Sequence, residues 1–207
     1  MVIPTAAGPC LDGIYLRGGA PPLLIASPLP GGGGSMLSPP VNELAYAAAY
    51  AGRASLRLDY RGVGGSEGEL SSEPELAVED LREGLAHLLE SVPGASTLAL
   101  AGYDSGCWVA LALASREPRV DRLILVSPPE GPPPAGVPGW SSVEMPTLLV
   151  VGVPDPERDL RDERARLRGE AQHVRVELIR SADRTLREGL GALQRLVPPF
   201  LGAERRA

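Results

Sequence analysis

Short, nearly continuous apolar runs alternate along the chain with segments that have helical periodicity. Each apolar run is bounded by Gly, Pro or Ser, and this combination is typical of strands buried on both faces of a parallel sheet. The predicted strands cover residues 11–17 (with 2–5 as a hairpin partner), 23–26, 54–59, 97–101, 120–127, 147–152 and 174–179.

The segments between these strands predict helices at residues 41–50, 73–91, 107–115, 157–170 and 186–201. The clearest is 73–91, in which apolar residues repeat at helical spacing and Ser71 or Ser72 could cap the start. We expect 157–170 to be a solvated helix with i,i+4 ion pairs such as Asp162–Arg166. The last helix should terminate near Pro198-Pro199.

Alternating strands and helices predict an α/β fold with a mostly parallel sheet flanked by helices. The chain shows no repeat and no linker, so we expect a single domain over residues 1–207. Residues 128–140 form a Pro/Gly-rich loop that is too short to fold as a cap domain.

Composition narrows the possible functions. The net charge is −6 with a pI near 5.1, which argues against a nucleic-acid scaffold or an anionic membrane surface as the main partner. No apolar run is long enough to span a bilayer and the N-terminus lacks a signal-peptide pattern, so we expect a soluble, cytoplasmic protein. All 20 basic residues are arginine, which excludes lysine chemistry and suggests a high-GC, bacterial genome.

The sequence predicts neither a cofactor nor a metal. Two cysteines cannot supply a disulfide framework or a thiolate metal site. Cys107 starts a predicted helix and would gain some acidity from its dipole, but a packing role is the simpler interpretation. We expect Asp155, Glu157 and Asp159 to be solvated. The glycines at 31–34 are expected to form a flexible pocket rim, because no G-K-[ST] sequence follows.

The segment Ala101-Gly102-Tyr103-Asp104-Ser105-Gly106 joins a predicted strand to a predicted helix. Glycines two residues before and two after Asp104 permit a sharp turn, as in the G-x-S-x-G nucleophile elbow. Here aspartate stands where that pattern has serine, and Ser105 follows it. The segment therefore predicts an elbow that presents Asp104 above the sheet.

A second signature supports this prediction. The run R-x-D-x-R-G-x-G-x-S-E-G from Arg57 to Gly68 resembles the strand-to-loop segment of α/β-hydrolases. The loop at 27–34 resembles the H-P-x-P-x-x-G-G sequence of the same family, with Ser27 in place of histidine. Over nearly its whole length, the chain resembles small, cap-less hydrolases related to dienelactone hydrolases and short-chain esterases.

The resemblance assigns roles to particular positions. It places the oxyanion-hole equivalents at Leu29 and Ser105, and the acid at Asp155 in Gly152-Val153-Pro154-Asp155. The catalytic histidine of the family falls on Arg184, after Ala182-Asp183. Arginine remains protonated and cannot act as the base of a serine triad. The remaining histidines, His87 and His173, are expected to be ordinary surface residues away from the site.

Two functions remain open. The first is a hydrolase-fold protein without catalysis, in which Asp104 and Asp155 face Arg184 and the protein acts as a binding or interaction module. Its partner could be a small ligand, a protein or a second copy in a homodimer. The second is an active hydrolase of esters, haloalkanes or epoxides, with Asp104 as nucleophile or base. The serine-esterase mechanism itself is excluded because the base is missing.

Overall fold

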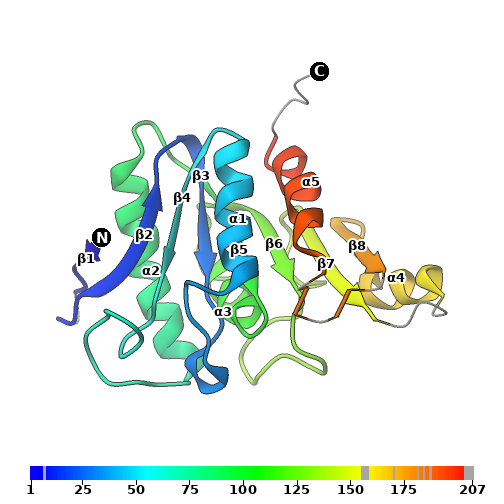
Figure 1. Cartoon of the computed structure of the whole chain (residues 1–207), viewed down its shortest axis with the longest axis horizontal. Coiled ribbons are helices and arrows are strands. Elements are labelled where there is room, and N and C mark those ends of the chain that lie inside the picture. The colour runs from blue at the N-terminus through cyan, green and yellow to red at the C-terminus, as the bar shows by residue number, and fades with distance from the viewer. Residues whose placement is uncertain are drawn as a thin grey trace.

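The sheet has eight strands in the order β1-β2-β4-β3-β5-β6-β7-β8 (Figure 1). The computed structural model describes residues 1–6, 8–154, 159–169, 171–180, 182–183, 185–186 and 188–202. Strands β1 and β2 are antiparallel to their neighbours and the others are parallel. Their bounds are β1 Val2–Ile3, β2 Leu11–Leu16, β3 Gly19–Ala26, β4 Arg53–Leu58, β5 Leu98–Tyr103, β6 Val120–Val126, β7 Thr147–Val153 and β8 Val174–Arg180.

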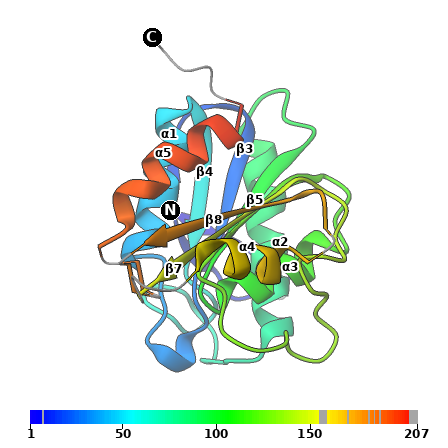
Figure 2. The ribbon, with the colours of Figure 1, turned by 90° about the vertical axis from the view of Figure 1, so that its right-hand side faces the viewer.

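Helices cover both faces of the sheet, as Figure 2 shows, with α1 and α5 on one side and α2 and α3 on the other. A hydrophobic core lies on each face of the sheet, and successive residues of each central strand point alternately into one core and the other. Leu24 packs toward α2 and α3, whereas Leu23 and Ile25 pack toward α1 and α5. The helix bounds are α1 Pro39–Tyr50, α2 Pro74–Ser91, α3 Gly106–Ala114, α4 Leu160–Arg168 and α5 Leu190–Phe200.

The predicted strands and helices are confirmed, with small shifts at their ends. The central strands are buried on both faces of the sheet, which explains why they consist of nearly continuous apolar residues. The expected end of the last helix near Pro198-Pro199 is confirmed, since α5 ends at Phe200, one residue after Pro199. Proline has no N–H group to donate and its ring clashes with the carbonyl four residues earlier, so two prolines in the last turn prevent the helix from continuing.

Two local predictions about polar residues are wrong. The N-cap of α2 is Glu73, whose side chain makes no capping bond; the Ser71 hydroxyl instead accepts a hydrogen bond from the Glu73 N–H at 3.1 Å. Within α4, Arg166 pairs with Glu163 at i,i+3 instead of Asp162. The carboxylate of Glu163 is almost buried, so this helix is not solvated on all sides.

The crossover from β6 to β7 contains no helix. Parallel neighbours in a sheet require a crossover connection, which is usually an α-helix. Here residues 127–146 cross the α3 side of the sheet as an irregular chain. Trp140 holds this loop in place: its ring stacks on Trp108 with centroids 5.9 Å apart, and its Nε1 donates to the Leu167 carbonyl at 2.9 Å.

No helix in the described ranges is long and apolar enough to cross a membrane.

The loop after β4 is tied to α2 by a buried ion pair. Arg61 donates from Nε and Nη2 to Asp80 at 2.9 and 2.6 Å, and its backbone N–H donates to the same carboxylate at 2.8 Å. Asp80 is 1% exposed, whereas Glu79, which also contacts Arg61, is half exposed. These hydrogen bonds raise the pKa of the Arg61 guanidinium.

We predict that Asp80→Asn destabilises the protein by about 3–5 kcal/mol, because it leaves Arg61 without its buried counter-charge. The matched control Glu79→Gln removes the exposed partner of the same guanidinium and should cost less than about 1 kcal/mol. Urea unfolding of the two variants measures both values. Equal effects of the two substitutions would show that burial of Asp80 does not matter.

Candidate functional site

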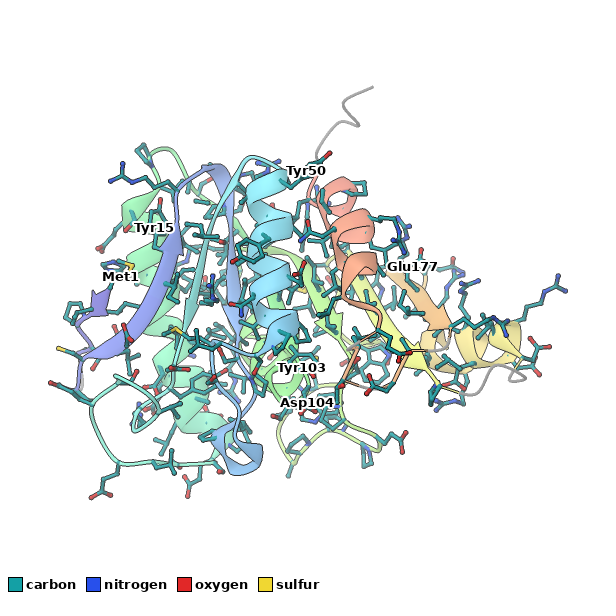
Figure 3. The ribbon with its side chains drawn as sticks, viewed as in Figure 1. Met1, Tyr15, Tyr50, Tyr103, Asp104 and Glu177 are labelled. Carbon is teal, nitrogen blue, oxygen red and sulfur yellow. The ribbon has the colours of Figure 1, made fainter. Side chains whose placement is uncertain are left out.

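The turn between β5 and α3 (residues 102–106, the Asp104 turn) forces Asp104 into an unusual backbone conformation. Its φ is +50°, in the left-handed region that aspartate adopts more readily than most residues. Asp104 is exposed at the carboxyl edge of the sheet, next to Tyr103, and Figure 3 shows both at the lower end of β5. Its N–H donates to the Val126 carbonyl of β6 at 3.0 Å.

Two glycines make this turn possible. A Cβ atom at Gly102 would lie 2.5 Å from the Gly106 carbonyl oxygen. A Cβ atom at Gly106 would lie 2.5 Å from the carbonyl oxygens of Ala26 and Ser27. Both distances are far below a van der Waals contact, so no other residue fits without displacing backbone. The predicted sharp turn around Asp104 is therefore confirmed in its geometry.

Backbone strain is concentrated along this edge of the sheet. The described residues other than glycine with positive φ are Asp104, Ser127 and Leu186, at +50°, +48° and +55°. They follow β5, β6 and β8, so all three belong to segments that leave the carboxyl edge. Strained backbone clusters at binding and active sites. This observation supports a site at the carboxyl edge, and the sequence offered no signal for Ser127 or Leu186.

The loop after β3 reaches the Asp104 turn through Leu29 and Ser105. Pairing of Ala26 with Gly102 aligns the ends of β3 and β5. The Leu29 N–H then donates to the Ser105 hydroxyl oxygen at 2.8 Å. The structure thus brings together the two residues expected at the oxyanion hole. It also shows that the Leu29 N–H already has an acceptor, which sequence reasoning missed because only the register of β3 and β5 creates the contact.

Ser27, which stands where the resembling sequences have histidine, has a structural role. It is fully buried, and its hydroxyl donates to the Leu58 carbonyl at 2.8 Å. Its own carbonyl accepts from the Tyr60 hydroxyl at 2.9 Å. Burial raises the pKa of Tyr60 strongly, so this phenol remains a hydrogen-bond donor. Ser27 therefore locks β3 to the end of β4.

The R-x-D-x-R-G signature likewise holds loops in place. Asp59 accepts from the Met36 N–H at 2.6 Å, which positions the approach to α1. Ser66 donates to the Asp59 carbonyl at 2.7 Å and accepts from the Asp12 N–H at 2.8 Å. Asp59 is buried, and desolvation raises its pKa despite the bond from Met36. The signature that resembles a hydrolase therefore acts here as scaffold.

Cys107 has no acidic thiol. It is fully buried behind the Asp104 turn, and burial raises its pKa well above the ordinary value. The helix-dipole effect considered from the sequence is smaller than this desolvation. The Sγ atom lies within hydrogen-bond distance of the Gly102 and Val126 carbonyls, at 3.3 and 3.4 Å. The packing interpretation of Cys107 is confirmed.

Both histidines of the chain lie away from the Asp104 turn. His87 is in the second half of α2, which leads toward the amino end of β5. His173 precedes β8, and its carbonyl accepts from the N–H of Thr147, the first residue of β7. Both therefore lie toward the amino edge of the sheet, opposite Asp104. Each is half-buried, so the expectation of ordinary surface residues was too simple.

Asp155 and Arg184 lie outside the described residues, as does Glu157, so the expected cluster with Asp104 stays a prediction. Asp159 is described, and its Oδ1 caps α4 by accepting from the Arg161 N–H at 2.7 Å.

Within the described part of the chain, no three His, Cys, Asp or Glu side chains are grouped as metal ligands. The glycine loop contains a short 3₁₀ helix, Pro30–Gly32.

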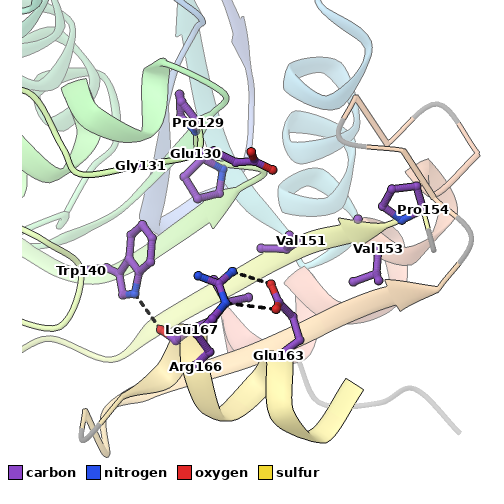
Figure 4. A pocket seen from close by; sticks show the side chains of 12 residues that line it. Pro129, Glu130, Gly131, Trp140, Val151, Val153, Pro154, Glu163, Arg166 and Leu167 are labelled. Atoms are coloured by element: carbon purple, nitrogen blue, oxygen red, sulfur yellow. Dashed lines mark hydrogen bonds and ion pairs between the residues drawn. The ribbon is translucent and has the colours of Figure 1, made fainter. Parts of the chain in front are cut away.

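A cavity of about 610 Å³ (the β7 pocket) lies between the β6–β7 crossover, the end of β7 and α4 (Figure 4). Its volume is in the usual range for small-molecule sites. The lining residues are Pro128, Pro129, Glu130, Gly131, Trp140, Val151, Gly152, Val153, Pro154, Glu163, Arg166 and Leu167. No sequence motif pointed to this pocket.

The strand order, the two antiparallel strands at one edge and the helices on both faces define an α/β-hydrolase fold without a cap domain. Residues 33–179, more than half of the chain, match the family described as serine aminopeptidase S33. The chain belongs to this family.

Solved structures agree with this assignment. An α/β serine hydrolase homologue from Coxiella burnetii superposes with a TM-score of 0.81 at 24% identity, over 97% of this chain and 96% of that one. A lid-less α/β serine hydrolase from Xanthomonas campestris superposes with a TM-score of 0.75 at 26% identity, over 99% of this chain and 95% of that one.

A sequence relative is also found. An uncharacterized protein of Rickettsia prowazekii is 34% identical over 74 residues, which is 36% of this chain and 31% of that protein.

We predict that Gly106→Ala destabilises the protein by about 1–3 kcal/mol, because the added methyl group has to displace the Ala26 and Ser27 carbonyls. The control Gly32→Ala places a methyl group where no atom lies within 4 Å, and should leave stability nearly unchanged. Thermal unfolding of both variants tests this. A Gly106→Ala protein as stable as wild type would contradict the tight packing of the Asp104 turn.

Burial also predicts the reactivity of the two thiols. Iodoacetamide should modify Cys10, which is half-buried, in the native protein and leave Cys107 untouched. After denaturation both cysteines should react. Peptide mass spectrometry distinguishes the sites, and rapid native modification of Cys107 would show that the space behind the Asp104 turn is open.

Proposed function

We propose that this chain is a non-hydrolytic member of the α/β-hydrolase fold that binds a small ligand. The observation that carries the proposal is the position of the imidazoles. The chain has two histidines, and both lie toward the edge of the sheet opposite Asp104. Hydrolysis through an ester intermediate needs a base to activate the attacking group and the water, and imidazole is the side chain suited to that task near neutral pH.

The Asp104 turn supports the same conclusion. Its glycine spacing and the positive φ of Asp104 resemble a nucleophile elbow, yet it carries a carboxylate where the G-x-S-x-G pattern has serine. One of the two expected oxyanion donors, the Leu29 N–H, is already bonded to the Ser105 hydroxyl. A developing oxyanion would have to break that bond before it gained this donor, so the stabilisation it normally receives would be reduced.

Ligand binding is the role that the remaining structure favours. The β7 pocket has the volume of a small-molecule site, and three apolar side chains, Val151, Val153 and Leu167, contribute to its walls. Arg184 in place of histidine is compatible with a guanidinium that pairs with carboxylates at the former catalytic centre. A scaffold of this kind retains a fold and a cavity without retaining the chemistry of its family.

One observation favours a second candidate. Asp104 is exposed and held at positive φ, as expected of a side chain presented to a substrate. A carboxylate oxygen of Asp104 could attack the carbon of a haloalkane, release halide and leave an ester on the protein. Without an imidazole to activate water, that ester would persist.

The test compares wild type with Asp104→Ala on p-nitrophenyl acetate, p-nitrophenyl butyrate and a panel of haloalkanes. We expect both proteins to match the buffer rate, and intact-mass spectra to show no alkyl adduct after incubation with haloalkane. The charge control Asp162→Asn lies on the exposed side of α4 and should behave as wild type. Turnover, or a mass adduct, that disappears only in the Asp104 variant would overturn the proposal in favour of the second candidate.

A further inference from the structure

Arg57 of β4 is a buried arginine without a counter-charge. Only 6% of the residue is exposed, and no ion pair joins it to a carboxylate among the described residues. Its Nε and Nη1 atoms are buried and have no hydrogen-bond partner in the described part of the chain. Arginine is rarely buried unless other groups satisfy its charge and its N–H donors. Unlike Arg61 of the same R-x-D-x-R-G signature, Arg57 ties no described segment to another.

A second unpartnered group lies beside Arg57. Ser55 is two residues earlier on β4, so its side chain is on the same face of the sheet, and its buried hydroxyl oxygen also has no described partner. Buried side-chain atoms without a partner are uncommon in proteins. Among the described residues there are five such atoms, and three of them belong to Ser55 and Arg57. Unmet hydrogen-bonding capacity is thus concentrated on this face of β4.

Apolar residues flank Arg57 within the sheet. It lies opposite Ile14 of β2 on one side and Ile25 of β3 on the other. Ser55 lies opposite Leu16 of β2 in the same way. Figure 1 shows that, on the side of the sheet that α1 covers, no described helix lies in front of β2. Ile14 and Leu16 are accordingly only half-buried, and solvent reaches this face of the sheet along β2.

Two carboxylates lie on the same face, and both already have partners. Asp59, two residues after Arg57, accepts a hydrogen bond from the Met36 N–H at 2.6 Å. Asp12, whose carbonyl accepts from the Asp59 N–H, lies 3.5 Å from the Met1 ammonium group. Neither carboxylate forms an ion pair with Arg57. A monoanion would therefore compensate the guanidinium, whereas a dianion would add surplus negative charge near two carboxylates.

Tyr46 of α1 lies close to the guanidinium. Burial lowers the pKa of Arg57, and the Tyr46 hydroxyl is near enough to counteract part of this effect. Arginine nevertheless stays charged in proteins. Tyr46 is itself 54% exposed, and among the described residues none forms a hydrogen bond with its hydroxyl. Because exposed side chains change rotamer within nanoseconds, Tyr46 can move away from Arg57 without breaking a hydrogen bond.

We propose that Arg57 anchors a binding site for a small monocarboxylate with an apolar substituent, such as a short alkyl carboxylate (the Arg57 site). Tyr46 rotates aside, and the carboxylate oxygens accept hydrogen bonds from the guanidinium. The alkyl chain packs over Ile14 and Leu16 of β2. The Arg57 site lies on the α1 side of the sheet, away from the β7 pocket and the Asp104 turn. Binding here goes beyond the proposed function and can be present or absent independently of it.

Methyl NMR tests the site, because Ile14 and Leu16 carry the methyl groups that the alkyl chain contacts. The probes are butyrate, a monoanion, butyramide, its uncharged counterpart, and propyl phosphate, which is dianionic in mildly alkaline buffer. We expect butyrate to shift the signals of these methyl groups saturably, and the other two compounds to bind more weakly by about tenfold or more. Equal or tighter binding of butyramide or propyl phosphate would overturn the proposal. So would the absence of a saturable shift with butyrate.

Two arginines on the same face of β4 provide a matched pair of variants. Arg57→Met should weaken butyrate binding by about tenfold or more, without lowering Tm, because the buried charge has no partner to lose. The control Arg53→Met removes donors to the Ala20 and Leu201 carbonyls, so it should lower Tm and leave butyrate affinity unchanged. Unchanged butyrate affinity in Arg57→Met would refute the assigned contact. A Tm lowered as much as in Arg53→Met would show that Arg57 has a structural role instead.

Discussion

The close approach of α3 to the end of β3 is the constraint on which the candidate site depends. At Gly106 the first turn of α3 lies directly against the Ala26 and Ser27 carbonyls, with no room for a Cβ atom. This contact fixes the sharp turn at Asp104, brings Ser105 within 2.8 Å of the Leu29 N–H, and seals Cys107 behind the turn. The sharp turn at Asp104 is thus maintained by the close packing of Gly102 and Gly106 against neighbouring backbone.

Besides the Arg57 site, the molecule has two separate candidate sites. The Asp104 turn lies at the carboxyl edge of β5, where strained backbone is concentrated. The β7 pocket lies over the α4 side of β7, where a loop replaces the crossover helix. Because a buried Glu163 orients Arg166 and a stacked Trp108 orients Trp140, the pocket is organised before any ligand enters.

The sequence motifs that indicate the family are structural in this protein. The residues that carry the hydrolase resemblance most clearly, from Arg57 to Gly68, tie loops together through Asp59, Arg61 and Ser66. Ser27 does the same at the end of β3. These contacts maintain the fold, and none of them involves the Asp104 side chain. Fold resemblance alone consequently says little about what is turned over or bound.

Strands and helices could be predicted from the sequence because they depend on local periodicity and on burial on both faces of the sheet. The turn at Asp104 was predictable for a similar reason, since two glycines at fixed spacing permit little else. Residue contacts between distant segments were not predictable in this way. The Leu29–Ser105 bond depends on the register of β3 and β5, and the choice of Glu163 over Asp162 as the partner of Arg166 depends on which side of α4 is buried.

The sequence by itself determined the α/β class, the order of the elements, and that aspartate stands at 104 in place of serine and arginine at 184 in place of histidine. Tertiary structure alone decided that Cys107 is fully buried, that Ser27 is structural, and that a pocket lies beside Trp140. The physical reason is the range of the interactions involved. Hydrophobic periodicity depends on residues that are close together in the sequence. Desolvation, strand register and cavity volume arise only when segments far apart in the chain pack together.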